Sequence, residues 1–158
     1  MKPRARRLIA ALAGMAAFAL AAGVANASPA QTANGDVTSG PFHIVFHAQR
    51  AANAPANAAT GTFDADTKLG PLTLMTLHGP VTCLEVRGNQ MGLFYPIASS
   101  TPPIFSMLRT GIFIYLTVDG AGHATNVQFL PVPIITTTGC APLLPPLLPA
   151  TGSAVLTS

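Results

Sequence analysis

Two histidines and two aspartates have spacings that could support chemistry. His43 and His47 are four residues apart, which on a helix would place both rings within reach of one metal ion. The residues around them alternate between apolar and polar, and this period of two predicts a strand. On a strand the two rings share a face but stand about 13 Å apart. We therefore expect solvent-facing histidines and no metal site, and the same for His78 and His123 at predicted strand ends.

Asp64 and Asp66 form a candidate carboxylate pair. On a strand they share one face about 7 Å apart, and such a pair could serve acid–base catalysis or bind Ca²⁺. The segment DADTKLG that begins at Asp64 resembles the opening of an EF-hand loop, but Lys68 occupies the third ligand position and Gly70 falls one place late. We expect these acids to discourage an exposed strand from pairing with other chains.

The sequence carries none of the common local signatures of catalysis. It contains no G-x-S-x-G, H-E-x-x-H, Walker A or G-x-G-x-x-G pattern. Serine, histidine and aspartate residues are scattered, and no local pattern joins them into a nucleophile triad. We therefore expect no catalytic residue, no bound metal and no cofactor.

The elements that carry these residues are predicted to be strands. After residue 40 the chain consists of short apolar runs bounded by Gly, Pro, Asn and Asp, which is typical of an all-β domain. Four strands are expected at 41–48, 61–66, 72–78 and 153–157, and two hairpins bring the total to seven or eight. This predicts one antiparallel domain over 41–158, either a sandwich or a small barrel. Residues 28–40 are expected to form a flexible arm, and 49–60 a long loop.

Both hairpins can be predicted with their register. The first joins 112–118 to 123–130, and pairing Ile114 with Val127 gives one consistently apolar or β-branched face. The second joins 82–87 to 90–95 through a Gly88-Asn89 turn of type II′, with Leu84 opposite Leu93.

Strand 112–118 is apolar on both faces, because Phe113 and Tyr115 lie on its second face. Phe94 lies on the outer face of the other hairpin. Such a strand belongs in the middle of an assembly or faces a ligand cavity.

The first 27 residues have the form of a cleaved signal peptide. Met1–Arg7 is basic, Leu8–Leu20 is apolar, and Ala25-Asn26-Ala27 places small residues before a cut between Ala27 and Ser28. The uncharged run 8–24 is near the lower limit for a membrane span, and the cleavage site favours removal. The apolar run 130–150 carries six prolines, which exclude a membrane-spanning helix.

Removal of this leader changes the charge of the chain. Four of the eight Lys and Arg residues lie within it, so the mature chain carries four cations against five acids and a net charge of −1. Nucleic acids and other polyanions need a basic patch, and four scattered cations do not form one.

Cys83 and Cys140 both lie after the cut, and two cysteines in an exported protein most simply form one disulfide. Two free thiols or a metal pair are the alternatives. Because Leu84 and Val86 occupy the core face of their hairpin, Cys83 must point to the opposite face. We expect the bridge to hold the proline-rich C-terminal segment across the outside of that sheet.

Residues 148–152 spell LPATG, which resembles the sorting motif that anchors proteins to Gram-positive cell walls. In that family an apolar span and a basic tail follow the motif, whereas here only SAVLTS follows. We therefore expect Leu148–Gly152 to end a loop and begin a last strand, without cell-wall anchoring.

The block VTCLEVRGN from Val81 to Asn89, with Cys140 far downstream and a short final strand, resembles a group of small exported actinobacterial proteins of uncharacterised function. The resemblance covers residues 41–157. It implies secretion, the disulfide and a β domain. That group has no known active site, so the resemblance assigns no site residues.

These observations predict an extracellular, non-catalytic binding or surface-interaction module whose partner is unknown. A small β-barrel that carries an apolar ligand is the alternative. A hydrolase that uses Asp64 or Asp66 with a histidine is a further one.

Overall fold

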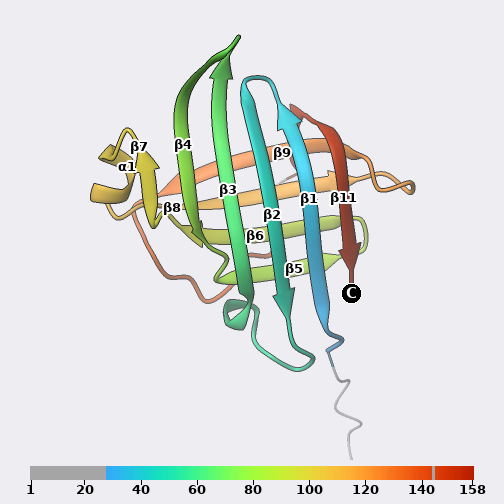
Figure 1. The fold of residues 1–158 in the computed structure, drawn as a ribbon. Helices are drawn as coiled ribbons and strands as arrows, with labels where there is room; N and C mark the ends of the chain where they lie inside the picture. The colour runs from blue at the N-terminus through green and yellow to red at the C-terminus, as the bar shows by residue number, and fades with distance from the viewer. Residues whose placement is uncertain (1–27, 144) are drawn as a thin grey trace, which may run out of the picture.

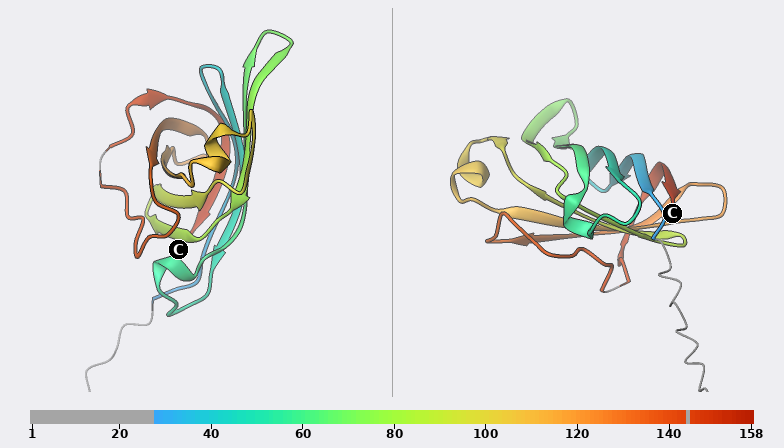
Figure 2. Two further views of the ribbon diagram at one scale, coloured as in Figure 1. Left: turned by 90° about the vertical axis from the view of Figure 1, so that its left-hand side faces the viewer. Right: turned by 90° about the horizontal axis from the view of Figure 1, so that it is seen from below.

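The computed structural model describes residues 28–143 and 145–158, so the whole predicted signal peptide, residues 1–27, lies outside the described residues. Two antiparallel sheets pack face to face with their strands crossing (Figures 1 and 2). They form a sandwich and do not close into a barrel. The all-β prediction is therefore confirmed as a sandwich, and the barrel alternative is wrong.

The front sheet in Figure 1 has six strands in the order β11-β1-β2-β3-β4-β7. Their bounds are β1 Gln31–Ser39, β2 Phe42–Arg50, β3 Thr60–Leu69, β4 Leu72–Pro80, β7 Ser99–Thr101 and β11 Thr151–Thr157. The 3-10 helix η1, Ala56–Ala58, lies in the predicted loop between β2 and β3.

The back sheet has five strands in the order β10-β9-β8-β6-β5. Their bounds are β5 Cys83–Arg87, β6 Gln90–Pro96, β8 Gly111–Val118, β9 Ala124–Val132 and β10 Leu148–Pro149. A single helical turn, α1 at Ile104–Met107, joins β7 to β8. Strand β8 lies in the middle of this sheet, as its two apolar faces predicted.

The core lies between the sheets and is built from the inward positions of alternating strands. Its largest fully buried side chains include Phe46, Phe63, Leu84, Ile114 and Leu116. Phe63 of the front sheet stacks on Tyr95 of the back sheet with ring centroids 3.8 Å apart.

Residues 28–40 are not a flexible arm, because β1 is an interior strand between β11 and β2. Its sequence is polar, yet Ala33 and Val37 point inward and are buried. Gly35 leaves room for the ring of Phe46, which a Cβ at that position would overlap. Strand β1 is thus stabilised by side-chain packing and by pairing with its neighbours, which its own composition does not predict.

The two predicted registers have different outcomes. In the second hairpin Leu84 pairs with Leu93 as predicted, and Gly88 has the positive φ of +59° that its turn requires. In the first hairpin Ile114 pairs with Phe129, so the predicted register was wrong by two residues. The cause is local: a bulge lies between Thr117 and Val118, and the Asp119 carboxylate accepts hydrogen bonds from two backbone N–H groups of the turn.

The disulfide joins Cys83 to Cys140 on the outside of the back sheet, as predicted. Both residues are buried with Phe94 in a cluster separate from the main core. Figure 2 shows the segment after β9 crossing the outer side of this sheet. Phe113 packs against this outer cluster, which accounts for the second apolar face of β8.

The LPATG segment is part of the fold. Leu148 of β10 pairs with Val127 of β9, and Thr151 begins β11. Ser39 donates a hydrogen bond to the carbonyl of Pro149 over 2.8 Å.

Candidate binding face on the six-stranded sheet

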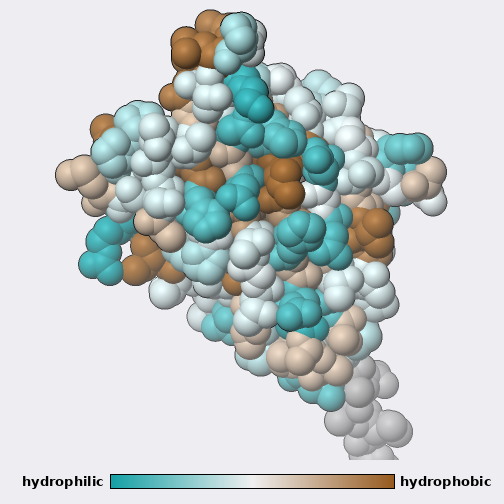
Figure 3. Space-filling view, in the orientation of Figure 1, coloured by the Kyte–Doolittle hydropathy of each residue, from teal (hydrophilic) through white to brown (hydrophobic). Residues whose placement is uncertain are grey.

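The outer face of the front sheet gathers most of the side chains that could do chemistry. No other element in the described part of the chain crosses in front of it (Figure 1). Figure 3 looks onto this face and shows it as mostly hydrophilic or neutral, with a few small apolar patches. Among its members are Thr32, Asn34, Asp36, His43, His47, Gln49, Thr60, Thr62, Asp64, Asp66, Thr76 and His78.

His43 bridges two carboxylates on neighbouring strands. Its Nε2 lies 2.9 Å from Oδ1 of Asp36 on β1, and its Nδ1 lies 2.9 Å from Oδ1 of Asp66 on β3. A neutral imidazole has only one N–H, so both contacts are hydrogen bonds only when His43 is protonated. The bond to Asp66, followed by the bond to Asp36, raises the pKa of His43 above its ordinary value.

The same contact acts on the carboxylate. The hydrogen bond from His43 is the main cause that lowers the pKa of Asp66, and Lys68 adds to it. Lys68 Nζ lies 3.0 Å from Asp66 Oδ2, an ion pair whose geometry does not make a hydrogen bond. The cluster of Asp36, His43, Asp66 and Lys68 thus ties together β1, β2 and β3.

A second histidine–carboxylate pair lies on β3 and β4. His78 Nδ1 is 2.6 Å from Asp64 Oδ1, and both side chains are more than half exposed. Ser99 of β7 pairs in register with His78, so Asp64, His78 and Ser99 form one row across three strands. This row has the acid–histidine–serine order of a nucleophile triad. Within residues 28–143 and 145–158, however, no hydrogen bond joins Ser99 to His78.

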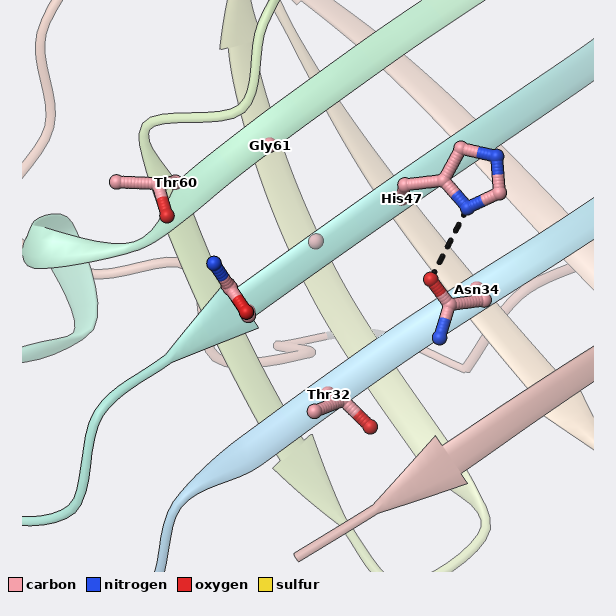
Figure 4. Close-up of a pocket in the computed structure, with 7 residues that line it drawn as sticks. Thr32, Asn34, His47, Thr60 and Gly61 are labelled. Carbon is pink, nitrogen blue, oxygen red and sulfur yellow. Dashed lines mark hydrogen bonds between the residues drawn. The ribbon is translucent and has the colours of Figure 1, made fainter.

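The third histidine lies beside a shallow depression of about 280 Å³ at the lower end of this face. His47 Nδ1 is 3.1 Å from Oδ1 of Asn34, as Figure 4 shows. The residues that line the depression come from β1, β2 and β3, and none of them is an acid, a lysine or an arginine. They are Thr32, Asn34, His47, Ala48, Gln49, Thr60 and Gly61.

The structure places most of the sequence-predicted residues as expected and adds their partners. His43 and His47 share the outer face of one strand. Asp64 and Asp66 also share that face, but each bonds a histidine instead of standing alone. Asp36 and Asn34 were missed because they lie in the segment predicted to be an arm. His123 bonds Asp119 within the turn before β9.

The described residues contain neither a cluster of metal-ligating side chains nor a helix suited to cross a membrane. In the described ranges no three His, Cys, Asp or Glu side chains are grouped so as to hold a metal ion. None of the described helices is long and apolar enough to span a membrane.

Comparisons with known proteins give no relative. No protein-family description matches the chain, and neither curated proteins nor solved structures include a match.

Proposed function

We propose that the protein is an exported, non-catalytic binding module that holds a hydroxyl-rich partner, such as a glycan chain, on the outer face of its front sheet. The observation that carries this proposal is the depression beside His47, where amide, hydroxyl and imidazole groups converge without a lysine, an arginine or an acid. Such groups both donate and accept hydrogen bonds, which is what sugar hydroxyls require.

The geometry of the depression supports binding of an extended partner. Its volume of about 280 Å³ lies just below the ~300 Å³ at which pockets for small ligands begin, so it fits one unit of a longer chain. The hydrogen bond between His47 and Asn34 fixes one nitrogen of the imidazole and leaves Nε2 and the Asn34 amide N–H groups to a ligand. The open sheet above the depression offers further hydroxyl groups of threonines, including Thr62 and Thr76.

Export is the setting that the disulfide supports. A bond between Cys83 and Cys140 persists in an oxidising compartment and is rare in a reducing one. Residues 1–27 have the composition of a signal peptide, and mass spectrometry of the exported protein would give its true N-terminus.

The aromatic side chains that suggested an apolar ligand are covered by other parts of the protein. Phe94 is fully buried beside the disulfide, and Tyr115 is also buried. Phe113 packs against the same outer cluster. These aromatic side chains contact one another and the C-terminal segment, so no ligand is needed to cover them.

Binding is tested by titrating the oxidised protein with soluble polysaccharides and following backbone amide shifts by NMR. We expect shifts confined to β1, β2 and β3 around the depression. Asn34→Ala and Gln49→Ala should weaken the interaction, whereas Thr101→Ala, on the same face but outside the depression, should not. Shifts that cluster elsewhere, or equal losses in all three variants, would refute the proposed site.

Hydrolysis by the row Asp64, His78 and Ser99 is the competing function, because the first two are within hydrogen-bonding distance. It predicts ester or glycoside turnover that disappears in both His78→Ala and Ser99→Ala. Under the binding proposal, neither variant changes any measured turnover.

A further inference from the structure

The hairpin of β3 and β4 extends beyond the rest of the front sheet. The pairing of β2 with β3 ends at Phe42 and Thr67, so the last residues of the hairpin have no neighbouring strand on either side. Figure 1 shows this hairpin projecting past the body of the molecule, and Figure 2 shows the same from a second side. Its turn is Gly70-Pro71.

The projecting tip is apolar where a turn in water is usually polar. Leu69 and Leu72 flank the turn as a register pair and are 69% and 60% exposed. Leu74 is the extra residue of the bulge that follows, and it is also exposed. We call these three leucines the hairpin tip. Exposed apolar groups gathered in this way mark a contact with a protein or a membrane.

A second apolar protrusion lies at the neighbouring edge of the same sheet. Strand β7 pairs with β4 and is the edge strand of the front sheet, and α1 follows β7, so α1 lies at the edge next to the hairpin, whose tip projects past the ends of the strands (Figure 1). Ile104, Met107 and Leu108 are all more than half exposed there. We call these three residues the α1 patch.

The more exposed charges near both features are basic, because Asp66, the acid that precedes the hairpin tip, is ion-paired with Lys68 and is the less exposed of the two side chains. Lys68 precedes the hairpin tip, and Arg109 follows the α1 patch. Neither 67–75 nor 99–111 contains an acidic residue, although the mature chain has more acids than cations. Cations beside exposed apolar side chains complement a surface of anionic headgroups over hydrocarbon.

The hairpin tip by itself is too small for an ordinary protein interface. Three partly exposed leucines offer a few hundred Å² at most, whereas a stable complex buries ~800 Å² on each partner. A bilayer surrounds an inserted tip on all sides and needs no matching groove. Two small insertions held by one rigid sheet also reinforce each other, as two anchors do when one alone binds only marginally.

From these observations we propose that the hairpin tip and the α1 patch bind the surface of an anionic lipid bilayer, with the leucines of the tip inserted below the headgroups. This site is separate from the binding face around His47, and either assignment stands without the other. Binding is reversible and weakens as salt screens Lys68 and Arg109.

The experiment measures co-sedimentation of the oxidised mature protein with vesicles of phosphatidylcholine alone or mixed with phosphatidylglycerol. We expect binding to the mixed vesicles, and a fall of about tenfold in the partition coefficient for Leu69→Ser with Leu72→Ser. The matched control is Leu143→Ser with Leu147→Ser, two exposed leucines outside both features, which should leave partitioning unchanged. Equal losses in the two double variants, or equal binding to both vesicle types, would overturn the proposal.

A second measurement keeps the apolar tip intact. The chain contains no tryptophan, so Leu72→Trp supplies a single fluorescent reporter at the tip. We expect a blue shift of its emission with the mixed vesicles and none for Val155→Trp, which reports from the exposed face of β11 at the far edge of the same sheet. An unshifted Leu72→Trp emission, or a shift that appears without vesicles as the protein concentration rises, would contradict insertion. The latter would assign the tip to contact with a second copy.

Discussion

The side-chain amide of Gln31 takes the place of a strand partner for the backbone of Val86. Its Nε2 donates to the Val86 carbonyl over 3.0 Å, and its Oε1 accepts from the Val86 N–H over 2.9 Å. Gln31 belongs to β1 of the front sheet, and Val86 belongs to β5 at the edge of the back sheet. One buried side chain therefore joins the two sheets and blocks an edge that another chain could otherwise extend.

Gln31→Leu should destabilise the protein by about 1–3 kcal/mol, because the buried N–H and C=O of Val86 lose both partners. Urea denaturation measures the loss. Gln49→Leu makes the same change at an exposed position in the same sheet and should stay within about 0.5 kcal/mol of the parent. Equal effects in the two variants would mean that the contact with Val86 contributes nothing.

Loss of the disulfide should have a larger effect. The bond closes a loop with a sequence separation of 57 residues, and chain entropy places its contribution at about 4 kcal/mol. The double variant Cys83→Ala with Cys140→Ala should lose about that amount in urea denaturation. Adding a reductant should lower the stability of the parent protein and leave the double variant unchanged.

Gly92 is needed beneath the C-terminal segment. A Cβ at this position would overlap the carbonyl of Cys140, which is fixed by the disulfide. Gly92→Ala should therefore cost about 1–3 kcal/mol through overpacking. Gly120→Ala is the control, since a Cβ there meets open space. A thermal midpoint for Gly92→Ala equal to that of Gly120→Ala would show that the segment moves aside freely.

The cluster around His43 should make stability depend on pH in two directions. The folded pKa of His43 is raised, so its contribution is complete below the unfolded value of 6.5 and is lost as pH rises through the folded pKa. The folded pKa of Asp66 is lowered, so its contribution is complete above the unfolded value of 3.8 and is lost as pH falls through the folded pKa. The two contributions therefore overlap between these values.

His43→Gln should lower stability by about 0.2–1 kcal/mol within that window, the range measured for solvent-exposed ion pairs, and by less at alkaline pH. Denaturant midpoints measured across the pH range test this. His47→Gln is the control, because the ring of His47 contacts an amide and no carboxylate. A parallel displacement of the His43→Gln curve at every pH would show that the effect is not ionic.

The LPATG segment should resist a cell-wall transpeptidase in the folded protein. Leu148 is paired with Val127, and the Ala150 N–H donates to the Thr125 carbonyl over 3.0 Å. A chain held in this way cannot lie extended in an enzyme cleft. Incubation with transpeptidase and an amine acceptor should leave the oxidised protein intact, whereas the reduced and denatured chain should be cut.

Strong alternation and tight turns made much of this fold predictable. Strand β2 alternates clearly, and the hairpin of β5 and β6 has a turn whose residues dictate its type, so the register and the face of Cys83 followed. The register predicted for the first hairpin was wrong because a bulge and the side chain of Asp119 alter its turn. Local composition does not disclose such a bulge.

The candidate site was harder to predict because its contacts cross between strands. Asp36 bonds His43 only because β1 pairs with β2, and β1 has too few apolar residues to be recognised alone. The same holds for Asp64 and His78, whose alignment depends on the register of β3 with β4. A sequence shows which side chains share one face of a single strand. It does not show which side chains become neighbours on two adjacent strands.

The place of β1 also bears on how the chain reaches its final state. A nascent or translocating chain emerges from its N-terminus, so β1 is available first, yet one of its two neighbours is β11, with Thr32 paired to Thr157. Contacts between such distant residues form slowly, because a long loop must close before they are gained. One of the two pairing edges of β1 therefore stays open until β11 has emerged, and the front sheet cannot be completed before that point.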